Sequence, residues 1–176
     1  QGEHREQILR GGEFQDVPWD PALTLRRFTP LRPTLDNQYT LWDCVARPLG
    51  LEAGQPSLSL LRALPGQIAQ PELTAVFSGD RLVALSPEHA AYALAVDIGT
   101  TTVVCSLVNM QSGALVTEEA FLNPQKAFGL DVLSRIHHSM EAEEGAAALQ
   151  RVLIDRLNTA IRALTDRAAV RPELVY

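Results

Sequence analysis

The stretch that decides the fold is DIGTTT, residues 97–102, which separates two strand candidates. Residues 92–98 form a nearly continuous apolar run, and residues 102–108 are rich in β-branched side chains. Both patterns are typical of β-strands. So short a connection predicts a hairpin, with Asp97 at the end of a buried first strand and Gly99 near the tip.

The residue types at this tip are suited to binding phosphate. Gly99 has no Cβ, so the backbone can turn there and approach a ligand closely. Thr100, Thr101 and Thr102 offer backbone N–H groups and hydroxyls, which can form a nest of donors for phosphate oxygens. Mg²⁺ with its retained waters suits the place between the Asp97 carboxylate and a phosphate. The alternative interpretation is a plain β-turn in which Asp97 hydrogen-bonds its own loop.

Working outward, the C-terminal half continues the hairpin. Strand candidates over residues 92–98, 102–108 and 114–121 are joined by tight connections, which predicts an antiparallel meander. Two helices are expected after it, over residues 129–140 and 143–166, the second because apolar residues recur at helical spacing.

Residues 21–87 are expected to form a small α+β unit. Apolar and polar residues alternate from Leu23, which predicts a strand. Thr34 is the expected N-cap of a helix over residues 35–46, and Pro48 follows that helix.

The same unit continues with a helix and a hairpin. A second, short helix is expected to begin at Ser57 and to end at Pro65. Residues 73–77 and 81–85 alternate in polarity, and residues 78–80, Ser-Gly-Asp, are a hairpin-turn sequence between them. The fold class predicted for the whole chain is therefore α/β, an α+β unit followed by a meander and helices.

Composition excludes several classes of protein. The chain has 176 residues, of which 46% are hydrophobic and 20% charged, and its formal net charge is −6. A disordered or collagen-like chain is excluded by the apolar content. The acidic balance argues against general binding to nucleic acid or to an anionic membrane. No apolar run approaches the roughly 20 residues that a membrane-spanning helix needs.

Few residues of this sequence are arranged as metal ligands. Cys44 and Cys105 lie far apart and neither has a CxxC partner, so no iron–sulfur or zinc site is expected within the chain. Free thiols in a cytoplasmic protein are the simpler interpretation. His137 and His138 are adjacent on an expected helix and point about 100° apart, so a solvated or half-buried face is favoured over a metal site.

Residues 94–108 resemble the first phosphate-binding hairpin of the superfamily of actin, sugar kinases and heat-shock chaperones. A narrower pattern follows in residues 123–136, NPQ…FG-x-DV-x-SRI. This pattern resembles that of the reductive activators of corrinoid, cobalamin-containing proteins. Those activators are ATP-dependent iron–sulfur proteins with a ferredoxin-like domain, a linker, a small middle domain and a C-terminal ATPase domain.

The resemblance implies a domain assignment. Residues 1–20 would be the linker, residues 21–87 the middle domain, and residues 88–176 the first part of a truncated ATPase domain. The ferredoxin cysteine cluster is absent from this sequence, and the chain lacks an initiator Met. We therefore expect a fragment, with the second phosphate loop and the adenosine pocket beyond Tyr176.

The resemblance also implies a function. The parent protein would use ATP and Mg²⁺ to reduce an inactive Co(II) corrinoid protein to Co(I), with its iron–sulfur cluster outside this chain. Asp97 would be the catalytic and Mg²⁺-binding residue, and Gly99, Thr100, Thr101 and Thr102 would bind the nucleotide. The isolated chain is expected to be inactive and able to dimerise through its incomplete sheet edge.

Two other functions remain open at this point. One is a small-molecule kinase of the same superfamily, whose catalytic base would lie beyond Tyr176. The other is a non-catalytic module that docks a partner through residues 21–87.

The NPQ and SRI motifs carry residues of open role. Asp131 and Arg135 are spaced i, i+4, which favours a helical ion pair, whereas the resemblance suggests a place beside the nucleotide cleft or a partner surface. Asn123 and Gln125 flank a proline, so they belong either to a turn or to the lining of a site.

Overall fold

The computed structural model describes residues 18–51, 56–141 and 143–176. The expected linker over residues 1–20 lies almost entirely outside these described residues. In the described part, the chain is mixed α/β with two three-stranded sheets, as its sequence predicts.

The chain divides into two compact units. The N-terminal unit comprises residues 19–92 and 109–113. The meander unit comprises residues 93–108 and 114–176 in its described part. Each unit has its own sheet and its own hydrophobic core.

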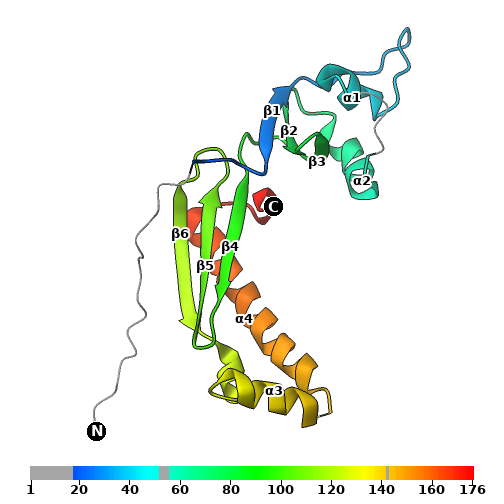
Figure 1. The fold of residues 1–176 in the computed structure, drawn as a ribbon. Coiled ribbons are helices and arrows are strands. Elements are labelled where there is room, and N and C mark those ends of the chain that lie inside the picture. The colour runs from blue at the N-terminus through cyan, green and yellow to red at the C-terminus, as the bar shows by residue number, and fades with distance from the viewer. Residues whose placement is uncertain (1–17, 52–55, 142) are drawn as a thin grey trace. The chain divides into compact units, whose positions relative to one another are not determined.

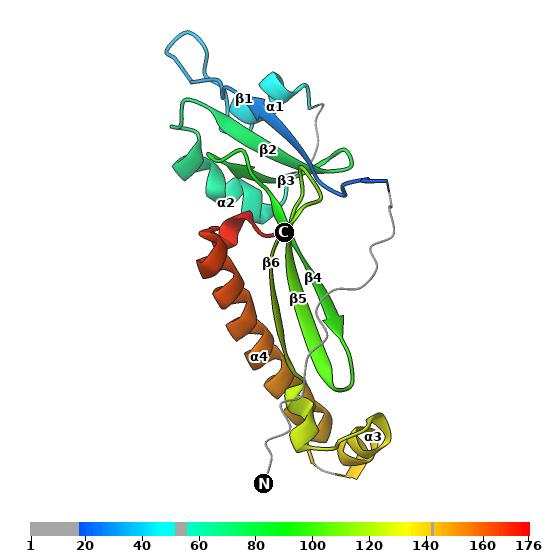
Figure 2. The ribbon, with the colours of Figure 1, turned by 90° about the vertical axis from the view of Figure 1, so that its left-hand side faces the viewer.

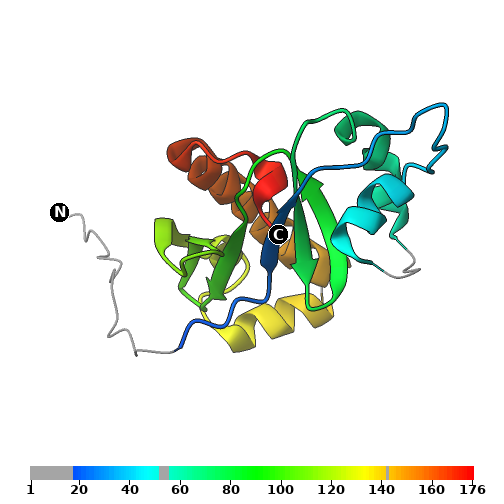
Figure 3. The same cartoon turned by 90° about the horizontal axis from the view of Figure 1, so that it is seen from above.

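The N-terminal unit has an antiparallel sheet of order β1-β2-β3 with two helices beside it (Figures 1 and 3). Side chains from strands and helices share one core, in which Val45, Leu64 and Leu73 are almost fully buried. Its elements are β1 (Thr24–Phe28), α1 (Asp43–Leu49), α2 (Leu58–Gln67), β2 (Leu73–Ser78) and β3 (Arg81–Ser86).

The hairpin of β2 and β3 confirms the turn predicted at residues 78–80. Gly79 has a φ of 57°, a left-handed conformation that glycine adopts without steric cost. The strands end within one residue of their predicted bounds.

The helix predicted over residues 35–46 is wrong in its first two turns. Thr34 lies in a separate turn, where its hydroxyl accepts a hydrogen bond from the Asn37 N–H at 3.1 Å. The helix begins at Asp43 instead, because Thr40 and Asp43 hydrogen-bond each other reciprocally and close a capping box there.

The second helix starts where the sequence predicts and runs further. The Ser57 side chain accepts a hydrogen bond from the Leu60 N–H at 3.2 Å, as an N-cap does. Pro65 does not end the helix, since a proline removes only its own donor and the Ile68 N–H still bonds the Leu64 carbonyl at 3.0 Å.

The meander unit confirms the predicted order of three strands followed by two helices. Its sheet has the order β4-β5-β6, and the long helix α4 lies along one face of that sheet (Figures 1 and 2). The elements are β4 (Tyr92–Ile98), β5 (Thr102–Asn109), β6 (Leu115–Leu122), η1 (Pro124–Ala127), α3 (Val132–Glu141), α4 (Gly145–Ala168) and η2 (Pro172–Leu174).

Both helices begin later than their patterns predict. The helix expected from residue 129 starts at Val132, because Asp131 caps it by accepting a hydrogen bond from the Ser134 N–H at 2.8 Å. The second helix starts at Gly145, after Glu144 in a left-handed conformation with a φ of 59°.

The core of the meander unit lies between the sheet and α4. Val103 and Cys105 of β5 pack with Phe121 of β6 against Ala160 and Leu164 of α4. Cys105 is fully buried, as its alternation along the strand predicts.

The prediction that the tip follows a buried strand is wrong. β4 is an edge strand of the described sheet, and Val96 and Ile98 are 40% and 52% exposed. Leu94 is the only described residue of β4 that packs against the core under α4. The reason is that α4 makes its closest contacts with β6, at the opposite edge of the sheet.

Candidate functional site

The predicted hairpin tip is formed by the three residues between β4 and β5. The Gly99 N–H donates to the Thr102 carbonyl at 2.9 Å and closes the turn. Gly99 does not have a positive φ. A Cβ at Gly99 would lie 2.7 Å from the Thr102 carbonyl oxygen, so the glycine is required by the closure of the hairpin itself.

Asn123 connects the end of β6 to the tip. Its Nδ2 donates to the Gly99 carbonyl at 2.9 Å, and its backbone N–H donates to the Thr101 carbonyl at 2.8 Å. Its Oδ1 accepts a hydrogen bond from the Gln125 N–H at 3.0 Å. The side chain is 1% exposed, so these contacts fix it in the interior.

Arg135 of α3 also reaches the tip. Its Nη2 donates to the Thr100 carbonyl at 2.7 Å, and its Nε donates to the Gly129 carbonyl at 2.9 Å. The residue is 8% exposed. The helical ion pair expected with Asp131 is not among the ion pairs of the described residues.

Asp131 instead serves the start of α3. The Ser134 backbone N–H holds the pKa of the Asp131 carboxyl below its usual value, and the nearby Arg135 charge contributes least to that lowering. Ser134 Oγ in turn donates to the Asp131 carbonyl at 2.9 Å.

Asn123 and Arg135 line a shallow cavity of about 300 Å³. The predicted site residues Gly99 and Thr100 border it, together with the side chains that hold the tip. Its apolar wall includes Ile98 of β4 and Val132 and Ile136 of α3.

The other predicted site residues lie outside the cavity lining. Asp97 is exposed, and among the described residues its carboxylate has no hydrogen-bond or ion-pair partner. Because side chains alternate along a strand, Asp97 faces away from the side of β4 that carries Leu94 and Ile98. Thr101, in the tip, and Thr102, the first residue of β5, do not line the cavity.

The sequence alone leaves the roles of Asn123 and Arg135 open. Asn123 lies in the NPQ motif and Arg135 in the SRI motif. Asn123 is 24 residues from Gly99 and Arg135 is 35 residues from Thr100, so sequence patterns, which are local, do not predict these contacts. The Gln125 side chain binds α4 and not a tip carbonyl: its Nε2 donates to the Leu149 carbonyl at 3.1 Å.

No metal site emerges in the described part of the chain, where no three His, Cys, Asp or Glu side chains cluster. His137 pairs with Glu141 at 2.8 Å on the surface, and His138 packs on the Phe128 ring with a centroid separation of 4.8 Å. Cys44 and Cys105 are free and buried in different units, and burial raises the pKa of both thiols.

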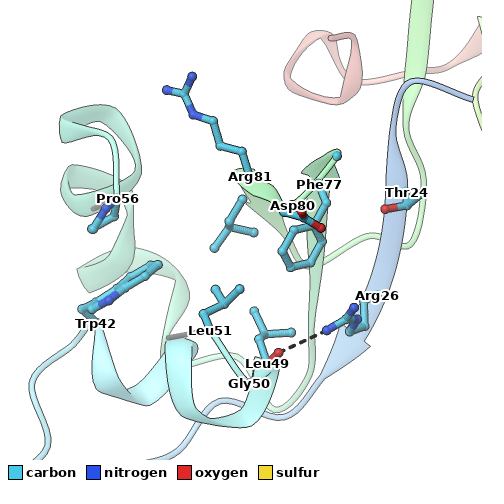
Figure 4. Close-up of a pocket in the computed structure, with 12 residues that line it drawn as sticks. Thr24, Arg26, Trp42, Leu49, Gly50, Leu51, Pro56, Phe77, Asp80 and Arg81 are labelled. Atoms are coloured by element: carbon cyan, nitrogen blue, oxygen red, sulfur yellow. Dashed lines mark hydrogen bonds between the residues drawn. The ribbon is translucent and has the colours of Figure 1, made fainter. Parts of the chain in front are cut away.

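A larger cavity, of about 750 Å³, lies in the N-terminal unit (Figure 4). Trp42 and Phe77 line it, and Arg26 lies over the Phe77 ring while donating to the Leu49 carbonyl at 3.1 Å. None of the predicted phosphate-binding residues borders this cavity, so we place the candidate site at the hairpin tip, which borders the smaller one.

Comparisons with known proteins agree on one group. Residues 92–176 match a family model described as the RACo middle region. The chain is 28% identical over 179 residues to the corrinoid activation enzyme RamQ of Eubacterium limosum, across 97% of this chain and 30% of that protein. A solved reductive activator for corrinoid, iron–sulfur protein superposes with a TM-score of 0.69 and 26% identity, over 92% of this chain and 28% of the other.

The matches cover defined parts of both chains. The chain spans less than a third of the length of the relatives it matches. The segment that matches the middle region is residues 92–176, whereas the assignment of residues 21–87 as a middle domain stays a prediction. The helices of the described residues are all too short or too polar to cross a bilayer.

Proposed function

Because this chain is a homologue of the reductive activators of corrinoid proteins, we propose that it is part of an ATP-dependent activator that reduces a Co(II) corrinoid protein to Co(I). The observation that carries the proposal is the coincidence of two independent features. The alignment with a corrinoid activation enzyme covers 97% of the chain, and that chain contains an exposed hairpin tip with phosphate-binding residue types.

In this proposal the tip binds the phosphates of the nucleotide. The backbone N–H groups and hydroxyls of Thr100 and Thr101 have no partner among the described residues, so they are available to phosphate oxygens. The tip protrudes between two strands and is open to solvent at Thr100 and Thr101, which leaves room for a ligand.

Asp97 fits a role in holding Mg²⁺. Its carboxylate is exposed, precedes the tip by two residues and has no partner among the described residues. A hard cation with retained waters takes oxygen ligands of this kind, and when bound it would neutralise phosphate charge. Asp97 therefore orients the cation through water in this proposal.

The chain's own residues do not fit an iron–sulfur cluster. Its two cysteines are buried in different units, and cluster ligation requires several thiolates at one place. The electron would come from a cluster elsewhere in the parent protein, one electron converting Co(II) to Co(I). Nucleotide binding would then act as a conformational switch for an uphill transfer rather than as a phosphotransfer step.

The proposed partner is a corrinoid protein. The relatives that match are by their names activators of corrinoid proteins, and the acidic balance of this chain argues against nucleic acid as the partner. The two free, buried thiols support a cytoplasmic location for the parent protein.

The test uses the full-length protein with a corrinoid protein and a low-potential one-electron reductant. We expect the Co(I) absorption band to appear only when Mg-ATP is present. Formation of Co(I) at the same rate without nucleotide would contradict the proposal. Stoichiometric phosphorylation of a small molecule would favour the kinase alternative instead.

A further inference from the structure

All three carbonyl groups of the tip are held from outside the hairpin. Asn123 binds the carbonyls of Gly99 and Thr101, through its side chain at 2.9 Å and its backbone N–H at 2.8 Å. Arg135 binds the Thr100 carbonyl at 2.7 Å. The two residues come from different elements, the end of β6 and helix α3, and approach the same three peptide groups.

This arrangement fixes the direction of the tip N–H groups. In a planar trans peptide the C=O and the following N–H point in opposite directions. The N–H groups of Thr100, Thr101 and Thr102 therefore each face away from the donor that holds the preceding carbonyl. Among the described residues, the N–H groups of Thr100 and Thr101 find no acceptor.

We propose that Asn123 and Arg135 are positioning residues that hold the tip as a preformed anion-binding nest. This inference rests on the proposed function of the tip as a phosphate site and assigns two residues that act on it. By holding the carbonyls on the side away from the ligand, the pair keeps the free N–H groups directed at the ligand. No rearrangement of the tip is then needed when phosphate binds.

The burial of Arg135 supports a role beyond packing. A guanidinium that is 8% exposed has lost most of its hydration, and its hydrogen bonds here go to neutral carbonyls. Burying a charge without a carboxylate partner is costly. The Asp131 carboxylate is near enough to interact with this charge electrostatically, and an anion at the tip would add a second negative charge near Arg135.

The turn before α3 sets the position of Arg135. The Gly129 carbonyl accepts from Arg135 Nε, and Asp131 and Ser134 cap the helix. A Cβ at Gly129 would collide with the Ser134 side chain, so glycine is needed for the chain to turn this closely. The FG-x-DV-x-SRI pattern thus contains both Arg135 and the residues that fix the position of its side chain.

The first test replaces an amide by an isosteric carboxylate in full-length protein. Asn123→Asp keeps an acceptor for the Gln125 N–H but removes the donor to the Gly99 carbonyl. Gln125→Glu is the matched control, because it adds the same charge in the same cavity without touching a tip carbonyl. Affinities for Mg-ATP and for adenosine are measured with each variant by titration calorimetry.

We expect Asn123→Asp to weaken Mg-ATP binding about tenfold more than Gln125→Glu does, since the Gly99 carbonyl loses its donor and the Thr100 N–H is no longer held toward the phosphate. Adenosine affinity should be equal in the two variants, because adenosine carries no phosphate. A variant that was merely misfolded would lose both ligands.

The second test is Arg135→Lys, which keeps the charge but cannot reach the Gly129 and Thr100 carbonyls together. It applies even if Asn123→Asp fails to fold. We expect a selective loss of Mg-ATP affinity, and unchanged amide signals for Thr100 and Thr101 in [15N]threonine-labelled protein would overturn the inference.

The outcomes separate the two proposals. If wild-type protein binds Mg-ATP better than adenosine but neither Asn123→Asp nor Arg135→Lys changes that preference beyond the control, the positioning role is wrong and the phosphate site stands. If wild-type protein shows no preference for Mg-ATP, the phosphate site and the positioning role both fall.

Discussion

Asp97 is the residue on which the proposed function depends most directly. Its carboxylate contributes little to the core, because it is exposed and makes no contact with a polar partner in the described residues. Function and stability are therefore separable at this position.

We expect Asp97→Ala to lower Mg-ATP-dependent hydrolysis and Co(I) formation in the full-length protein by at least about tenfold, since a cation ligand is lost. The unfolding free energy should change by no more than about 0.5 kcal/mol, as for other exposed substitutions. Asp80→Ala is the matched control, because Asp80 is an exposed carboxylate at the turn between β2 and β3. Full activity of Asp97→Ala would refute the cation-binding role.

Gly99 offers a second prediction at this scale, and it concerns stability. Gly99→Ala places a Cβ 2.7 Å from the Thr102 carbonyl, so we expect a loss of about 1–3 kcal/mol in urea unfolding. Gly66→Ala is the control: it meets nothing within 4 Å in α2 and should stabilise by roughly 0.5–1 kcal/mol. A neutral Gly99→Ala would mean that the tip relaxes easily and is not a preformed site.

An ion network joins strand β6 to helix α4. Glu119 of β6 binds Arg167 at 2.9 Å and Arg156 at 3.4 Å, both from α4. The pKa of the Glu119 carboxyl is lowered, first by the hydrogen bond from Arg167 and against the opposing effect of burial.

The lowered pKa predicts a pH dependence. Above the ordinary carboxyl value of 4.5 the ion network stabilises the fold fully, and this contribution is lost as the pH falls through the lowered pKa of Glu119. Glu119→Gln should therefore cost about 1 kcal/mol at pH 7 and make stability less dependent on pH below 4.5. Glu118→Gln, its neighbour on β6, is the control, and equal pH profiles for the two variants would rule out the network.

How far the sequence predicts these elements depends on the range of the interactions involved. Strands and the Gly79 turn follow from alternation and local turn chemistry, so their bounds are predicted within about a residue. The start of α1 was missed because two threonines compete as caps, and Thr34 closes a turn of its own.

The candidate site is predictable only in part, for a physical reason. The tip is recognisable because its glycine and threonines are contiguous in sequence. The hydrogen bonds from Asn123 and Arg135 to the tip are not recognisable in the sequence. They join residues separated by 24 and 35 positions and depend on how α3 folds back. The exposure of β4 is not predictable from its apolar sequence. Apolar side chains predict burial, but they do not indicate which strand or helix covers them.

At the scale of the whole molecule, the chain presents an unpaired strand edge. β4 ends the described sheet, and Val96 and Ile98 expose apolar surface there. Edge strands of this kind pair readily with other chains unless charge or proline blocks them. The relatives are more than three times as long as this chain, so a longer protein has residues available to cover the edge.

The last prediction therefore concerns the 176-residue chain by itself. The superfamily resemblance implies an adenosine pocket outside this segment, and hydrogen bonds from an exposed tip to phosphate are offset by lost hydration. The net charge of −6 adds no long-range attraction for an anion. We expect titration calorimetry to detect no micromolar binding of Mg-ATP, and light scattering to detect a dimer formed through β4.

Val96→Lys should convert that dimer to a monomer, because an edge lysine opposes strand pairing. Val116→Lys is the matched control: Val116 is also 40% exposed but lies on β6 at the opposite edge. A dimer that Val116→Lys disrupts and Val96→Lys leaves intact would place the interface at the other edge. Micromolar Mg-ATP binding by a monomeric chain would show that the meander unit is a self-sufficient nucleotide site, contrary to the two-lobed arrangement that the resemblance implies.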